Sequence, residues 1–514
     1  MSGRKDKQPL LPFSVDHQVE TFFDDYLIHY VQNVTRRLHR PEKFPEPVIK
    51  KDRPWEKIPY FGCSNWNTIY DPSEARFKCW YEDYDMSVWW AEKFFDTCQM
   101  FATSKDGLHW EKPDLDVNRI EGRQTNIVLG RDSYGSVHSA TIFLDPMETD
   151  SSKRFKTIYR RHRRGERKKD ARFGSEIITT DMATSPEGIH WTPVKENPLQ
   201  IENIGGDVLI ANRDLLTGKI IFMGRPSNAA TWSPHHPEDK FFFPPYDPNE
   251  PFGFLNKRNV WRSESLDAVN WSPATQSFRP DKHDNLDDGH YGLVHFRLGK
   301  LYVGILNIVH AVDNTMDLEL VCSRDDGCTW QRPFRSIPYV PRGRPGEWDC
   351  YFRTCCSPPA DVGKQTYVFF GGGSCHHDWW MYNDMGPDVP EKNDWGLVNF
   401  GLGLATFRRH GYVSLDAGVC DGILATKPFK RDGEKLVINA ACEKDGYVAV
   451  EVQDMYGRPW PGFTRKDCNV FTGDEIDHVV TWQGKNNLAE TSKYIKLAFY
   501  MKNASLYTLR LDKE

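Results

Sequence analysis

Histidine and aspartate recur at one equivalent position in several stretches of this 514-residue sequence. His138 and Asp207 each stand seven positions before an aspartate that ends an apolar, β-branched run. When two further apolar runs are aligned with the runs of His138 and Asp207, they place His290 and Asp349 at the equivalent position. Imidazoles and carboxylates that converge in a concave site can transfer protons, so these four residues are candidates for acid–base chemistry. The alternative is that they hydrogen-bond neighbouring sheets to one another around a wet channel.

Polar and aromatic residues near these positions are candidates for binding a substrate. Glu347 is an alternative acid to the two aspartates. The segment 375–380, which reads Cys-His-His-Asp-Trp-Trp, could bring imidazoles and indoles over the same site, or could be a solvated loop with one stacked tryptophan. The candidate binding residues are Asn65, Arg225, Asp288, Tyr291, Trp348, His377 and Trp379. We predict no cofactor; a divalent metal in a central channel is an alternative that needs further ligands, such as His138 or His290.

A short phrase, Ser-x-Asp-Gly-x-x-Trp in its clearest form, indicates which elements position these residues. Each copy follows an apolar run and is followed by a proline, which is typical of a strand, a tight hairpin and a second strand opened by tryptophan. Such a unit repeated along a chain indicates a propeller or a solenoid. The four copies lie at 104–110, 185–191, 265–271 and 323–330.

Five similar units can be delimited, each with short strands and no helical periodicity between them. We therefore predict an all-β protein, with a five-bladed β-propeller at 58–418 that carries the catalytic site. In the fifth unit we expect the outer strand at 412–414. Residues 419–514 alternate apolar and polar side chains, which predicts a C-terminal antiparallel β-sandwich. Residues 1–57 are expected to form an N-terminal arm and strand.

The repeated hairpin, the five units and the segments 22–28, 323–327 and 412–418 resemble a branch of the five-bladed β-propeller glycoside hydrolases of families 32, 43, 117 and 130. The resemblance implies a carboxylate acid, a second carboxylate as base or nucleophile, and a third acidic group that tunes the pKa. It also implies a catalytic aspartate on the first strand of blade one, where this sequence has Ser64, Asn65 and Asn67. We therefore expect Asp207 and Asp349, with Glu347 as the alternative acid, to carry the chemistry. His138 and His290 would tune pKa values or act as acid or base.

The expected activity is cleavage of a glycosidic bond in an oligosaccharide or polysaccharide at the axial mouth of the propeller. Because the blade-one acid is missing, three alternatives stay open: a glycan phosphorylase, a polysaccharide lyase using His138 and Tyr291, and a non-catalytic glycan-binding propeller. The basic run 160–169 is a charged hairpin tip or a clamp for a carboxylate or sulfate on an acidic sugar. Arg225 is a second candidate for such a clamp.

Composition limits the other function classes. A net charge of −6 argues against nucleic-acid binding through bulk attraction to phosphate. No apolar run approaches the roughly 20 residues that a membrane span needs, and the first residues lack the apolar core of a secretory signal. The 12 cysteines form no CxxC pairs, so we expect them to be reduced in a cytoplasmic protein. Whether the chain forms a homo-oligomer stays open.

Overall fold

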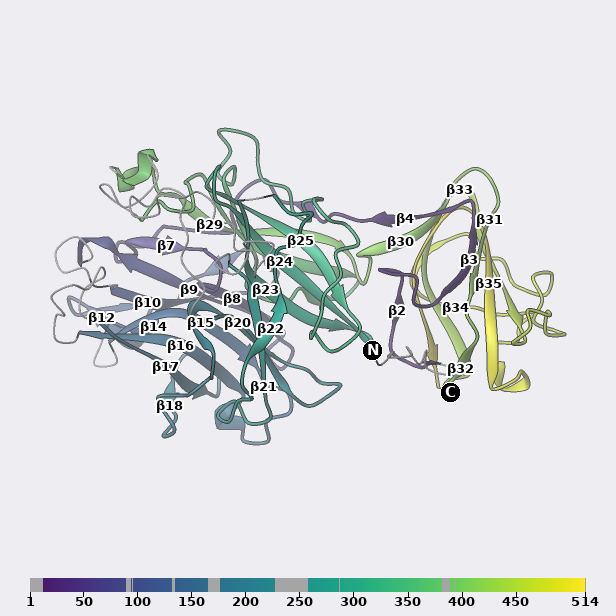
Figure 1. The fold of residues 1–514 in the computed structure, drawn as a ribbon, viewed down its shortest axis with the longest axis horizontal. Helices are drawn as coiled ribbons and strands as arrows, with labels where there is room; N and C mark the ends of the chain where they lie inside the picture. The colour runs from purple at the N-terminus through teal and green to yellow at the C-terminus, as the bar shows by residue number, and fades with distance from the viewer. Residues whose placement is uncertain are drawn as a thin grey trace, which may run out of the picture.

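The computed structural model describes residues 13–88, 94, 96–131, 135–164, 176–226, 258–285, 287–380, 389–392 and 394–513. Their regular structure is almost entirely β-strand, which confirms the predicted all-β class. Two units lie side by side, a five-bladed β-propeller and a smaller β unit (Figure 1). No helix among these residues is long and apolar enough to cross a membrane.

Blades one to four are antiparallel sheets of consecutive strands, as the repeat predicts. Blade one contains β8 (Trp66–Asp71), β9 (Arg76–Asp85), β10 (Asp96–Ser104) and β11 (Trp110–Glu111), with β7 (Ile58–Tyr60) and β14 (Ile127–Gly130) added. Blade two contains β15 (Ser136–Leu144), β16 (Phe155–Arg164), β17 (Glu176–Ser185) and β18 (Thr192–Pro193). Blade three contains β19 (Ile204–Arg213), β20 (Ile220–Pro226), β21 (Val260–Ser265) and β22 (Thr275–Phe278). Blade four contains β23 (Asp288–Leu298), β24 (Leu301–His310) and β25 (Thr315–Ser323).

Blade five takes its outer strands from the other end of the chain. Its own strands are β26 (Phe352–Thr354), β27 (Ala360–Val362), β28 (Gln365–Gly373) and β29 (Phe400–Arg408), and β29 pairs with β5 (Glu42–Lys43) and β6 (Ile49–Lys50). The expectation of an outer strand at 412–414 is therefore wrong, because β30 (Val413–Ala417) leaves the propeller. The N-terminal strands cover the edge that blade five would otherwise expose, and so close the ring.

The smaller unit, here called the terminal unit, combines both ends of the chain. From the N-terminal side come β1 (Ser14–Val15), β2 (Glu20–Thr21), β3 (Ile28–Gln32) and β4 (Val34–Leu38). They pair with β30, β31 (Gly422–Thr426), β32 (Phe429–Arg431) and β35 (Tyr494–Asp512), and β33 (Lys435–Gln453) and β34 (Asp474–Val479) complete the sheet. Because β1 runs parallel to β32, the sheet is mixed. This corrects the predicted C-terminal antiparallel sandwich.

The N-terminal strands of the terminal unit are too short to bury their own apolar side chains. Phe22 and Leu27 instead pack into one core with Leu415, Phe499 and Leu506 from the other end of the chain. Figure 1 shows the purple N-terminal strands among green and yellow ones. The burial of these side chains favours a sheet built from both ends, since the hydrophobic contribution grows with the apolar area removed from water.

The repeated phrase forms the hairpin before the outer strand in blades one to three. In blade four the expected strand after Trp330 is reduced to an isolated bridge between Cys322 and Gln331. In the first copy, the backbone N–H of Gly107 donates to Ser104 Oγ at 2.9 Å, and Trp110 Nε1 donates to the carbonyl of Gly107 at 2.8 Å. The third copy repeats both bonds, with Ala268 in the place of the glycine. These bonds lie within seven residues of chain, so the phrase determines blade construction and not chemistry.

The hairpin of blade two also joins it to blade one, and this contact is testable. Trp80 Nε1 donates to the carbonyl of Gly188 at 2.6 Å, and a Cβ on Gly188, whose φ is +85°, would lie 2.3 Å from the Trp80 ring. We expect Gly188→Ala to lower the free energy of unfolding by about 2–4 kcal/mol, from overpacking and left-handed strain together. Gly122→Ala is the matched control, because its φ is +81° with nothing within 4 Å of its Cβ. Chemical denaturation of both variants measures the difference, and equal losses would contradict the proposed contact.

An aspartate at the end of each of the first three inner strands links neighbouring blades. Each is buried, accepts an ion pair from an arginine of the following blade, and has its pKa lowered because the cationic partners outweigh burial. Repetition of one buried pair at successive blade junctions indicates a structural role for these aspartates. The pairs are Asp71–Arg154 at 2.7 Å, Asp145–Arg213 at 2.8 Å and Asp214–Arg297 at 2.8 Å.

The aspartate–arginine pairs predict a pH-dependent stability. Replacing Asp145 by Asn leaves Arg213 and Lys156 without their buried partner, and should cost about 3 kcal/mol or more near neutral pH. The folded pKa of Asp145 is depressed, so its contribution is complete above the ordinary pKa of about 3.9 and is lost as the pH falls through the folded value. The gap between the unfolding midpoints of wild type and Asp145→Asn should therefore narrow below about pH 4. A gap that stays constant down to the acid transition would contradict this account.

Candidate active site at the propeller mouth

A local irregularity at the start of three inner strands directs polar side chains into the mouth of the propeller. The pairing register shifts between His138 and Thr141 in β15, between Ile204 and Leu209 in β19, and between His290 and Gly292 in β23. Such bulges re-aim side chains and are common beside active sites. Inner strands of a propeller converge on its axis, so these residues of blades two, three and four meet there.

A carboxylate holds the ring of His138 in place. His138 Nδ1 lies 2.7 Å from Glu82 Oε1, and the Tyr84 hydroxyl lies 3.1 Å from the same nitrogen. The other oxygen of Glu82 accepts from Asn65 Nδ2 at 2.6 Å and from the backbone N–H of Ser139 at 3.0 Å. Glu82 is fully buried, and its partners leave it one orientation. A carboxylate paired with one ring nitrogen orients a histidine for proton transfer through the other.

Asp207 is the accessible carboxylate of the mouth, with 35% of its side chain exposed. Its Oδ1 lies 2.6 Å from Arg225 Nη1 and 3.5 Å from Arg258 Nη1. Burial raises the pKa of Asp207, but Arg225, Arg258 and His138 outweigh burial and hold it well below its usual range. Asp207 therefore stays ionised at neutral pH. It suits attack on, or stabilisation of, a developing positive charge, and it is a poor proton donor.

Aromatic residues form a wall beside Arg258, which contacts Asp207. The guanidinium of Arg258 stacks on the Tyr291 ring at 3.7 Å, and Tyr291 meets His377 with ring centroids 5.0 Å apart. His377 Nδ1 lies 2.7 Å from Asp378, whose second oxygen accepts from Asn314 at 2.7 Å. Burial raises the pKa of Tyr291, so its hydroxyl stays protonated. Tyr291 and His377 are both buried, so these contacts hold the guanidinium of Arg258 in a fixed position.

The structure brings together half of the predicted site residues. These are Asn65, His138, Asp207, Arg225, Tyr291 and His377. Four further members have no counterpart in the sequence-based prediction: Glu82, Tyr84, Arg258 and Asp378. Glu82 and Tyr84 lie on the second strand of blade one, whereas the alignment considered first strands. Alternation along β9 was the signal that could have found them, because residues two apart share a face of a strand.

Asp349 lies in a separate charge network between blades four and five. Its carboxylate accepts from Arg353 at 2.7 Å and from Lys43 of β5 at 2.8 Å, and Lys43 also lies 3.9 Å from Glu347. Burial raises the pKa of Asp349, and Arg353 and Lys43 outweigh it. Phe352 stacks on His377 at the mouth, so the neighbouring Arg353 faces away from it. This position suits Asp349 to holding the N-terminal strand on blade five.

The remaining predicted residues also have partners outside the mouth. His290 packs on Phe278 with ring centroids 4.5 Å apart, and burial lowers its pKa to about 3. The bulge in β23 presents Tyr291 to the mouth and turns His290 into the space between blades. Asp288 pairs with His310 at 2.6 Å, and Trp348 Nε1 donates to the carbonyl of Pro45 at 2.8 Å. Trp379 is 1% exposed and packs against Tyr60 and Tyr84, so it offers no sugar platform.

No metal site is found among the described side chains. They include no group of three or more His, Cys, Asp or Glu arranged to hold an ion. The cationic pair Arg225 and Arg258 beside Asp207 would itself oppose a divalent cation there.

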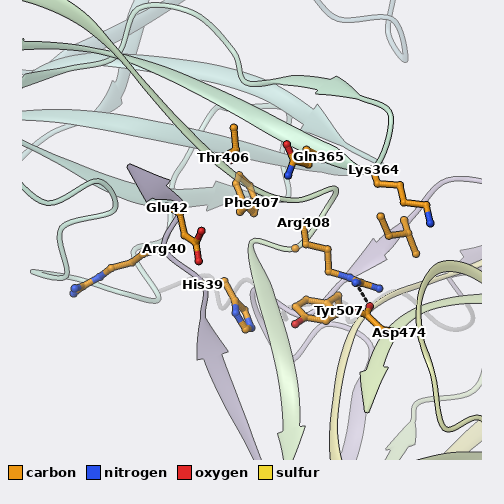
Figure 2. A pocket seen from close by; sticks show the side chains of 12 residues that line it. His39, Arg40, Glu42, Lys364, Gln365, Thr406, Phe407, Arg408, Asp474 and Tyr507 are labelled. Atoms are coloured by element: carbon orange, nitrogen blue, oxygen red, sulfur yellow. Dashed lines mark hydrogen bonds and ion pairs between the residues drawn. The ribbon is translucent and has the colours of Figure 1, made fainter. Parts of the chain in front are cut away.

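A cavity of 480 Å³ lies elsewhere, where blade five meets the terminal unit (Figure 2). Arg408 crosses it, paired with Asp474 and stacked over Tyr507 at 5.0 Å. Figure 2 shows Glu42 and His39 on the opposite side of Arg408 from Lys364. None of the residues that line this cavity belongs to the mouth, and the contacts of Arg408 join the two units.

Comparison with known proteins concerns the fold of the chain. No protein-family model matches the sequence, and no curated protein matches it either. Among solved structures, a glycoside hydrolase is similar at 12% identity and a TM-score of 0.44, over 72% of this chain and 92% of the other. An N-acetylgalactosamine deacetylase from F. plautii, in complex with blood group B trisaccharide, matches at 13% identity and 0.44, over 73% and 96%. An α-L-arabinofuranosidase from Podospora anserina, in complex with cellotriose, matches at 10% and 0.42, over 72% and 97%.

The propeller is similar in structure to five-bladed glycoside hydrolases at low sequence identity. The predicted resemblance is confirmed at the level of the fold. A fold does not by itself specify a reaction, because function depends on the side chains of the site.

Proposed function

We propose that this chain is a carbohydrate-active enzyme that cleaves a glycosidic bond at the propeller mouth. The observation that carries the proposal is an accessible, ionised Asp207 beside His138, whose ring a buried carboxylate fixes. In glycoside cleavage, one group protonates the departing oxygen while a carboxylate supports the oxocarbenium-like carbon. His138 would supply the proton through Nε2, which lies 3.2 Å from Ser139 Oγ, and Asp207 would supply the negative charge.

Glu82 acts through His138 in this proposal. Its buried carboxylate is hydrogen-bonded to Nδ1, so it favours a proton on that nitrogen and stabilises the imidazolium that precedes proton donation. After cleavage, neutral His138 can accept a proton from water as the second step proceeds.

Elimination beside a uronic acid is a second candidate. The Tyr84 hydroxyl lies 3.1 Å from His138 Nδ1, so a tyrosine and a histidine are placed to relay a proton. Arg225 and Arg258 could neutralise the carboxylate of the sugar, which makes the neighbouring carbon more acidic. This reaction uses no attacking water and leaves an unsaturated product.

A screen of aryl glycosides and of neutral and uronate oligosaccharides, with and without phosphate, tests the proposal. New reducing ends that form without phosphate support hydrolysis, and phosphate dependence would indicate a phosphorylase. Ultraviolet absorbance of an unsaturated uronate would indicate elimination. Saccharides that bind and are never cleaved would overturn the enzymatic proposal in favour of a glycan-binding propeller.

A further inference from the structure

Three guanidinium groups surround one accessible carboxylate in the mouth. Arg225 and Arg258 lie 2.6 and 3.5 Å from Asp207, and Arg160 interacts electrostatically with the same carboxylate. Arg160 is held by Thr180 Oγ1 at 2.5 Å and by the carbonyl of Gly205 at 3.3 Å, so it cannot swing out into solvent without losing both. Among the residues that the structure describes, Asp207 is the carboxylate that forms ion pairs with Arg225 and Arg258.

The other carboxylates near these arginines are already engaged. Asp181 lies 3.4 Å from Arg161, and Asp378 accepts from Asn314 and contacts His377. Each therefore contributes to the field at the mouth but offers the arginines no direct hydrogen bond. The arginines beside Asp207 are therefore the groups of the described mouth that suit an anionic group entering from outside.

Arg258 has a buried donor close to Asp207. Its Nη1 has no hydrogen-bond partner, although the side chain is only 12% exposed. Stacking on Tyr291 at 3.7 Å fixes the plane of the guanidinium. A buried donor is rarely left unsatisfied, and a fixed planar guanidinium matches a carboxylate in two parallel hydrogen bonds.

We infer that the mouth recognises a sugar that bears a carboxylate, such as a uronic acid residue, and that Arg258 with Arg225 binds this carboxylate beside Asp207. The inference rests on the proposed function in one respect, that a saccharide occupies the mouth. A carboxylate that enters here would meet guanidinium groups held in place beside Asp207. A neutral sugar would offer the donor of Arg258 no charged acceptor.

Calorimetric binding to the full chain tests the inference without any need for turnover. The probes are oligogalacturonate and oligoglucuronate, their methyl esters, and the corresponding neutral oligosaccharides. We expect at least one acid to bind 10-fold or more tightly than its methyl ester, with a preference that falls as salt rises. Arg258→Gln should remove the preference. Arg342→Gln, in the network between blades four and five, is the matched control and should retain it.

The outcomes separate this inference from the proposed function. If Arg258→Gln fails to fold, the acid-to-ester ratio of the wild type and its salt dependence still decide the matter. Equal binding of acids and esters, tighter binding of sulfated sugars, or no acid that binds better than its neutral counterpart would overturn the inference. Cleavage of neutral sugars with no preference for acids would support the proposed function and contradict the inference. Tight binding of acids without cleavage would support the inference and contradict the proposed function.

Discussion

Asp207→Asn is expected to reduce kcat by about 10³-fold or more on any substrate that the screen identifies. The carboxamide keeps the shape of the side chain but removes the negative charge that Arg225, Arg258 and His138 hold in place. Binding of the substrate should persist, because the aromatic wall and the other polar groups remain. Initial rates together with calorimetry measure both effects.

Asp349→Asn is the matched control for Asp207→Asn. It removes an equal charge from the other predicted carboxylate, which pairs with Arg353 and Lys43 in blade five. We expect turnover to stay within a few-fold of wild type, while the thermal unfolding midpoint falls because a buried ion pair has lost one partner. The reverse pattern, with turnover lost in Asp349→Asn and retained in Asp207→Asn, would overturn the assignment of the site.

His138→Gln should reduce kcat by about 10²–10⁴-fold if this residue donates the proton. The loss should depend on the leaving group. Aryl glycosides whose phenol leaves without protonation need no acid, so His138→Gln should retain most of its activity on them. A loss of the same size for acidic and weakly acidic phenols would argue that His138 only positions the substrate.

Glu82→Gln tests whether Glu82 acts through His138. A residue that only orients and charges another adds little once its partner is gone, so the double variant should be about as slow as His138→Gln alone. Multiplicative losses would show that Glu82 works independently. Circular dichroism and the unfolding midpoint serve as controls, because Glu82 also accepts from Asn65 and Ser139.

The candidate site could be predicted only in part. The register of His138 and Asp207 was visible because both lie on inner strands of similar length that end in the same aspartate turn. The same alignment selected His290, which the structure turns away from the mouth, and Asp349, which it pairs with Lys43. Arg258 had no local signal, since its role depends on Tyr291, a residue of another blade.

Local sequence determined the blade hairpins, the strands of blades one to four and the all-β class. The reason is that the interactions act over a short stretch of chain, since Ser104, Gly107 and Trp110 satisfy one another's hydrogen bonds within a single turn. The tertiary structure alone decided how the ring closes, because β5 and β29 are more than 350 residues apart in the chain and pair only once the blades are assembled. It also decided which side chains face the mouth. A shift of one residue at a bulge exchanges the faces of a strand, as it does for His290 and Tyr291, and such a shift depends on the packing of neighbouring blades.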